Sequence, residues 1–144
     1  MTTQTIHDQD STRKVEAYLV LEDARIGTLP SHFGVRMMTV EHTVYHFMRE
    51  FVAEYKGAFW DFYELSNGGF YMAPSCNPVK FNIHSNGFEG TLSADAAGIT
   101  VCLFTFSHLS FQQPSEDMFS RHFYALREFA LDHKEAGLIF AAID

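Results

Sequence analysis

Two histidines have a spacing that could serve metal chemistry. His42 and His46 stand four residues apart in a segment with helical periodicity, so one helix face would present both imidazoles. Position 43 is Thr, so the pair lacks the glutamate that acts as general base in zinc proteases. Neither cysteine belongs to a CxxC pair. A metal-dependent hydrolase is a minor alternative; the favoured interpretation is a solvated pair of histidines, and no metal or cofactor is expected.

The serines do not form a recognisable nucleophile motif. Ser66, Ser93 and Ser107 each lie near an acid or a histidine in the sequence, yet none occupies a GxSxG turn. The SNGG segment at 66–69 lacks the spacing and the lysine of a phosphate-binding loop, and the sequence has no GxGxxG motif. These residues therefore do not predict an assembled active site.

An aromatic segment, FWDFY at 59–63, could stack single-stranded bases if it lay on an open sheet. Such a platform needs neighbouring cations to hold the phosphates, but Lys56 and Lys80 are the only basic residues between positions 51 and 100. A sheet buried against helices is therefore favoured. A nucleic-acid-binding module with an aromatic sheet surface remains the alternative function.

The chain is acidic, with ten Lys and Arg against eighteen Asp and Glu and a formal net charge of −8. The charge is spread evenly, at −2 over residues 1–50, −3 over 51–100 and −3 over 101–144. A DNA duplex of about 40 Å, roughly the diameter of a domain this size, carries about 24 phosphates. The even spread argues against DNA mimicry, and the excess of acid argues against direct binding to nucleic acid or to an anionic membrane.

Length and composition predict one domain with its own core. The chain has 144 residues, of which 47% are hydrophobic and 15% aromatic. Residues 1–13 are polar and predict a flexible leader, which leaves 14–144 as the folded domain. The sequence shows neither a secretory signal nor an uninterrupted apolar run of membrane-spanning length, so we expect reduced cysteines and a cytoplasmic location.

The first half of the domain predicts an extended segment, a loop and a helix. Apolar residues alternate with others over 15–22, which favours an extended segment, with a short helix as the alternative. Gly27, Pro30 and Gly34 predict a loop over 24–34. A stripe of apolar residues then predicts a helix from an N-cap at Thr39 to Gly57.

The middle third predicts an antiparallel meander of three or four strands. Turn residues at 66–69, 74–78 and 86–87 separate four apolar segments at 57–65, 70–73, 79–83 and 88–92. Ser93 then predicts the N-cap of a second helix with Asp95 in its first turn, and Ser115 begins a third. With a short helical tail at 137–144, the expected fold class is α+β, with about three to four helices.

The segment GAFWDFYELSNGGFYMAP (57–74) resembles the ArdB/KlcA family of antirestriction proteins. Four further blocks are similar to the family's pattern in the same order: LPSHFG (29–34), NGFEGTLSADAAGI (86–99), YALREFALDH (124–133) and AID (142–144). The resemblance covers nearly all of residues 15–144.

The resemblance implies a non-enzymatic inhibitor of host type I restriction-modification systems, encoded on conjugative plasmids and other mobile elements, that protects unmodified incoming DNA without mimicking it. The implied partner is a host type I restriction enzyme or a host factor that controls it, while the oligomeric state is not indicated. The candidate partner-binding residues are shared family positions: Asp144, Trp60, Tyr63, Asn67 and Asp95. Asp144 ranks first, because a hairpin also explains Asn67 and a helix start also explains Asp95.

Overall fold

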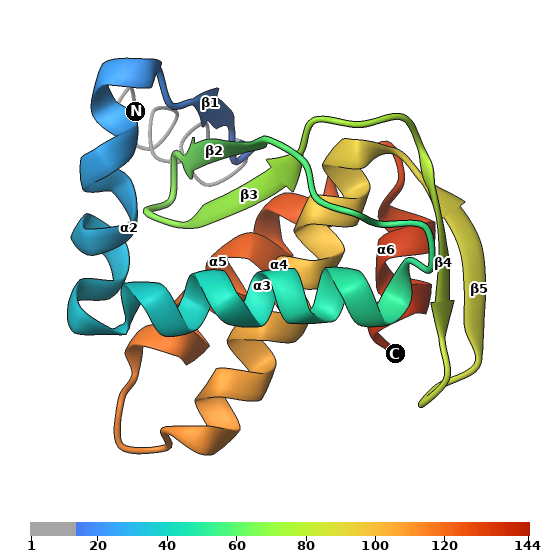
Figure 1. Ribbon diagram of the computed structural model, residues 1–144. Coiled ribbons are helices and arrows are strands. Elements are labelled where there is room, and N and C mark those ends of the chain that lie inside the picture. The colour runs from blue at the N-terminus through green and yellow to red at the C-terminus, as the bar shows by residue number, and fades with distance from the viewer. Residues whose placement is uncertain (1–13) are drawn as a thin grey trace, which may run out of the picture.

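The computed structural model describes residues 14–144, so the predicted leader at 1–13 lies outside the described residues. Five strands, two short 3₁₀ segments and five α-helices alternate along this part of the chain (Figure 1). The α+β fold class is confirmed. In chain order the elements are β1 (Ala17–Leu19), η1 (Glu22–Ala24), α2 (Arg25–Phe33), η2 (Gly34–Arg36), α3 (Met37–Phe51), β2 (Trp60–Leu65), β3 (Phe70–Pro74), β4 (Val79–Ile83), β5 (Phe88–Leu92), α4 (Ala94–Gln112), α5 (Met118–Leu131) and α6 (Ala136–Ile143).

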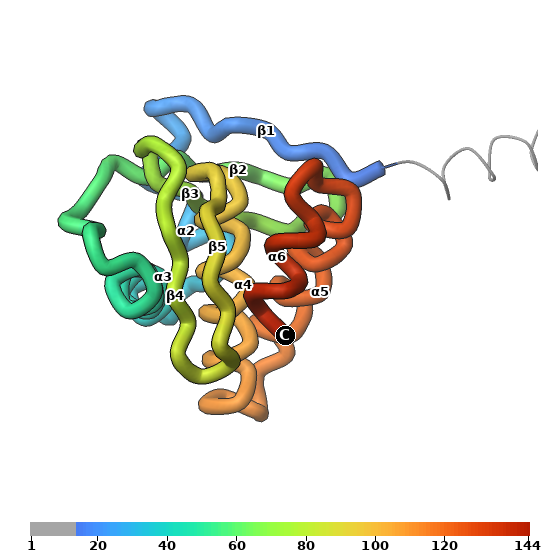
Figure 2. The backbone as a smooth tube through the Cα atoms, turned by 90° about the vertical axis from the view of Figure 1, so that its right-hand side faces the viewer, coloured from blue at the N-terminus to red at the C-terminus, as the bar shows by residue number. Residues whose placement is uncertain are grey.

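The strands form two separate antiparallel sheets instead of one meander. β1, β2 and β3 make one sheet in that order, and β4 pairs only with β5. Pro74 ends β3 and Pro78 immediately precedes β4, and neither has a backbone N–H to continue a ladder. Both predicted hairpin turns are present, with Gly68 and Gly87 at positive φ. Figure 2 shows the β4–β5 hairpin apart from the three-stranded sheet, beside α6.

The segment expected to be a loop at 24–34 is the helix α2. Burial overrides the helix-breaking residues here, because Leu29 and Phe33 lie four residues apart and both enter the core. Pro30 lies inside the helix and removes one backbone hydrogen bond. Gly34, with φ of 52°, does end the helix as a glycine should.

The helix predicted from Thr39 is α3, and its apolar stripe is confirmed. Val40, Val44, Met48 and Phe51 are all buried. Its bounds were wrong: the helix starts at Met37 and ends at Phe51, well before Gly57. The preceding 3₁₀ turn continues directly into the helix, so Thr39 does not act as a cap.

The second predicted helix, α4, is the centre of the molecule. The Ser93 cap is confirmed, since its Oγ accepts a hydrogen bond from the backbone N–H of Ala96 at 3.1 Å. α4 packs against β3, α3, α5 and α6. It is long and apolar enough to cross a membrane, yet most of its surface is buried within the protein. Gly98 lets it approach β3 closely, because a Cβ there would lie 2.4 Å from the carbonyl oxygen of Met72.

The third predicted helix and the helical tail are α5 and α6. α5 turns Phe119, His122, Leu126 and Ala130 toward the core. α6 packs on α4 and on β5, which brings the C-terminal end of the chain against the second sheet (Figure 2). The apolar core therefore surrounds α4, and the polar groups of interest lie where its neighbours meet.

Candidate functional site

Asp95 lies in a hydrogen-bonded network that joins β3, α4 and the connection between α5 and α6. Its Oδ1 accepts from the hydroxyl of Tyr71 at 2.7 Å, and its Oδ2 lies 2.8 Å from Nε2 of His133. The backbone N–H of Glu135 donates to Nδ1 of His133, so the imidazole proton is on Nε2 and points at Asp95. Burial opposes the ionisation of Asp95, but the hydrogen bonds from His133 and Tyr71 outweigh it and lower its pKa.

A second carboxylate extends this network to the start of α4. Glu135 accepts a hydrogen bond from the backbone N–H of Ser93 at 3.0 Å and another from its hydroxyl. Although burial opposes ionisation, these hydrogen bonds lower the pKa of Glu135. The hydrogen bonds of Asp95 and Glu135 are made within the protein, so this network holds β3, α4 and the α5–α6 connection together.

Trp60 and Tyr63 also have partners within the fold. Trp60 is 3% exposed, and its indole N–H donates to the hydroxyl of Tyr55 at 3.0 Å. Tyr63 stacks on Tyr71, with ring centroids 4.7 Å apart. Phe62 is buried beneath the guanidinium of Arg25. These rings are packed in the protein and are not free to stack on bases.

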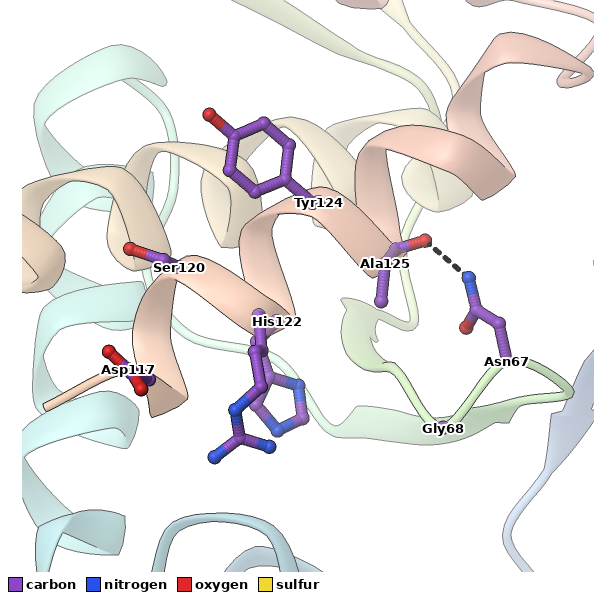
Figure 3. A pocket seen from close by; sticks show the side chains of 8 residues that line it. Asn67, Gly68, Asp117, Ser120, His122, Tyr124 and Ala125 are labelled. Carbon is purple, nitrogen blue, oxygen red and sulfur yellow. Dashed lines mark hydrogen bonds between the residues drawn. The ribbon is translucent and has the colours of Figure 1, made fainter.

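Asn67 fixes the turn between β2 and β3 against α5. Its Oδ1 accepts from the backbone N–H of Gly69, and its Nδ2 donates to the carbonyl of Ala125 and to Glu128, both at 2.9 Å (Figure 3). Gly69 permits this contact, because a Cβ there would lie 2.8 Å from Cβ of Ala125. Asn67 is exposed, but its side-chain amide is already engaged.

A cleft of about 610 Å³ opens beside this turn. We call it the turn–α5 cleft; it is lined by Asn67, Gly68, Asp117, Ser120, Arg121, His122, Tyr124 and Ala125. Figure 3 shows His122 on the side of α5 that faces Gly68, with Ser120 and Tyr124 on the other side of the helix in this view. His122 is not among the site residues predicted from the sequence. The only signal was its spacing from Phe119 and Leu126, which places it on the buried face of α5.

His122 is a buried imidazole among aromatic rings. Its ring centroid lies 4.6 Å from that of Phe33 and 5.0 Å from that of His32. Its Nδ1 is buried without a hydrogen-bond partner among residues 14–144. Burial lowers its pKa to about 4, helped by His32 and by the positive charge of Arg121. The imidazole is therefore neutral at pH 7.

Asp144 does not line the turn–α5 cleft. Its side chain is exposed beside a second cleft of about 460 Å³, lined also by Arg127, Phe140, Ala141 and Ile143. Both clefts border α5, the first at Tyr124 and Ala125 and the second at Arg127, but no residue lines both. The five predicted contact residues thus do not converge on one site.

His42 and His46 are both exposed on α3. Within residues 14–144, no group of three His, Cys, Asp or Glu side chains is placed to hold a metal ion. The geometry defines a small α+β domain that offers polar clefts and an exposed acidic end, without an assembled catalytic constellation in its described part.

Comparison with known proteins identifies the family. The sequence profile of the antirestriction protein family matches residues 53–144. The antirestriction protein KlcA of Escherichia coli is 42% identical over 135 residues, covering 90% of this chain and 95% of KlcA. The uncharacterised protein YafX of Escherichia coli K12 is 37% identical over the full length of both chains.

A solved structure extends the match to three dimensions. It superimposes with a TM-score of 0.84 at 43% identity, covering 92% of this chain and 99% of the other. The match comes from the structures of the KlcA and ArdB proteins, which are described as showing a novel fold and antirestriction activity against type I DNA restriction systems in vivo but not in vitro. The chain belongs to the ArdB/KlcA family of antirestriction proteins.

Proposed function

We propose that this protein inhibits host type I restriction-modification systems through protein contacts and so protects unmodified incoming DNA, as part of a mobile element such as a conjugative plasmid. The observation that carries the proposal is the family relationship, which extends over 90% of the chain at 42% identity to KlcA. The activity described for KlcA and ArdB against type I systems supports the same target here.

Contacts with protein, instead of catalysis or DNA mimicry, fit the molecule best. The clefts combine charges of both signs, and the net charge of −8 is spread along the whole chain. A DNA mimic would need its carboxylates gathered on one face. The relatives act in vivo but not in vitro, which favours a partner that is supplied by the cell: a restriction enzyme in its cellular state or a host factor that controls it.

A phage plating assay tests the function. Expression of the protein should raise the plating efficiency of unmodified phage on a host with a type I restriction system. It should have no effect on a host that lacks the system. Equal plating with and without the protein on the restricting host would refute the proposal.

Asp144 is the first residue to test, because its side chain is exposed and forms no ion pair within residues 14–144. Asp144→Ala should reduce protection by about tenfold or more, as expected for a contact residue worth about 1.4 kcal/mol. Its thermal unfolding should stay near wild type. Asp132→Ala, at another exposed acid, is the matched control and should retain protection. Loss of stability together with protection would make Asp144 structural.

Co-purification tests the partner. Tagged protein from a restricting cell should retain a restriction subunit or a host factor that is missing from the pull-down with Asp144→Ala. If wild type and Asp144→Ala retain the same proteins, Asp144 is not needed for partner binding.

A further inference from the structure

Within residues 14–144, two buried side-chain atoms lack a hydrogen-bond partner: Nδ1 of His122, a residue that lines the turn–α5 cleft, and Oε2 of Glu116, the residue before Asp117. His122 is 6% exposed, and its Nδ1 has no hydrogen-bond partner among the described residues. A buried polar atom without a partner costs about 1–3 kcal/mol. The aromatic neighbours of the ring, Phe33 and Phe106, supply packing but no hydrogen bond of this kind. An apolar ring at position 122 would make the core more stable. We therefore expect the imidazole of His122 to have a role other than stabilising the fold.

The walls of the cleft are already fixed before anything binds. Asn67 holds the turn to α5 through two hydrogen bonds, to Ala125 and Glu128, while its Oδ1 accepts from Gly69 within the turn. Gly69 lets the two elements touch. A preformed cleft loses little conformational entropy on binding. It can therefore present His122 to an incoming group in a defined geometry.

The charges that line the cleft are balanced. Arg121 and Asp117 both line it, and neither forms an ion pair within residues 14–144. Two acids nearby have partners: Glu128 accepts from Asn67, and Glu116 pairs with Arg36 through Oε1, although its Oε2 has no partner among the described residues. An anion bound in the cleft would be repelled by Asp117, and a cation would be repelled by Arg121. Neutral groups that both donate and accept hydrogen bonds avoid either conflict.

We propose that the turn–α5 cleft binds a neutral hydrogen-bonding side chain, an amide or a hydroxyl, on a surface loop of the protein partner, with His122 as its buried contact. A neutral imidazole offers one donor and one acceptor nitrogen, which an amide or a hydroxyl can match. Arg121 and Asp117 then bind the carbonyl and N–H groups of the same loop. The partner is that of the proposed antirestriction function, on which this part of the inference rests.

Substitutions at His122 separate binding from folding. His122→Leu and His122→Phe remove the unmatched nitrogen, so they should unfold at or above the wild-type temperature while lowering phage protection about tenfold or more. His122→Gln keeps a donor and an acceptor and should retain most of the protection. His84→Leu, at an exposed histidine in the β4–β5 turn, is the matched control. Full protection by stable His122→Leu and His122→Phe would overturn the proposal. So would a loss of protection that tracks the loss of thermal stability across the His122 variants.

Small probes test the chemistry of the cleft independently of restriction. Acetamide, acetate and methylammonium are titrated at equal millimolar concentrations into isotope-labelled protein, with NMR signals of His122 and Gly68 as the readout. Acetamide should cause the largest shifts, and His122→Leu should remove the shift at Gly68. A stronger response to acetate or methylammonium would refute neutral recognition, and no response to any probe would refute the site.

The two experiments also separate this inference from the proposed function. Acetamide binding by a protein that gives no phage protection refutes the antirestriction role and leaves the chemistry of the cleft standing. Protection without any acetamide response refutes the cleft and leaves the antirestriction role standing.

Discussion

Replacing Asp95 by Asn is expected to destabilise the protein through a single misplaced donor. The new amide can still accept from Tyr71 through its oxygen, but its NH₂ group then faces Nε2–H of His133. His133 cannot relieve this conflict by moving its proton, because Nδ1 already accepts from the backbone N–H of Glu135. If the amide flips, its oxygen accepts from His133 and its NH₂ group can donate to the hydroxyl of Tyr71, but the hydroxyl proton of Tyr71 then lacks an acceptor.

The cost follows from these contacts. A hydrogen bond to a charged acceptor contributes about 1.5–3 kcal/mol, and an unmatched buried donor costs about 1–3 kcal/mol. His133 is 8% exposed, whereas Asp95 is 40% exposed and water can replace part of what is lost. We therefore expect Asp95→Asn to lower the free energy of unfolding by about 2–3 kcal/mol, which corresponds to a fall of roughly 4–12 °C in the unfolding midpoint.

The effect should depend on pH with a defined sign. The pKa of Asp95 is lower in the folded protein than in the unfolded chain, where it is about 3.9. Its ionisation therefore stabilises the fold above about pH 4, and this contribution is lost as the pH falls through the folded pKa. The difference between wild type and Asp95→Asn should be full near pH 7 and shrink near pH 3.

Urea unfolding followed by circular dichroism measures both quantities. Tyr71→Phe is the matched control: it removes one hydrogen bond without adding a donor, so it should cost less than Asp95→Asn. A variant Asp95→Asn within about 0.5 kcal/mol of wild type at pH 7 would refute the proposed proton arrangement. A difference that grows toward pH 3 would refute the sign of the pKa shift.

Two further predictions concern the core. Gly98→Ala should destabilise the protein by about 1–3 kcal/mol or more in urea unfolding, because the new Cβ would lie 2.4 Å from the backbone oxygen of Met72 and α4 must move away from β3; unchanged stability would contradict the close approach. With a thiol reagent at pH 8, Cys76 should react in the native protein and Cys102 only after unfolding, because Cys102 is fully buried and its pKa is raised to about 12; rapid reaction of both thiols before unfolding would contradict this.

Local features of the fold were predictable because neighbours in the sequence carry their signals. The stripe of α3, the cap at Ser93 and the turn at 66–69 each depend on residues within a few positions of one another. The helix α2 was missed because its stability comes from burying Leu29 and Phe33, which outweighs Gly27 and Pro30. No local signal shows that distant packing will override a propensity.

The arrangement of the strands was also beyond local signals. Alternation and turns predicted each hairpin, but they are compatible with one meander or with two sheets. The protein has two because β3 packs on α4 while β5 continues toward α6 and β4 lies against α3. Which sheet a hairpin joins depends on the helices that cover it.

The sequence by itself determined the α+β class, the family and the even spread of acidic charge. Only the tertiary structure decided what the shared family residues do. It buries Trp60, engages Asp95 with Tyr71 and His133 from 24 and 38 residues away, and leaves Asp144 exposed. It also places His122 at the edge of a cleft that the sequence did not reveal. The physical reason is that the role of a polar side chain depends on the groups that face it, and those come from elements far apart in the chain.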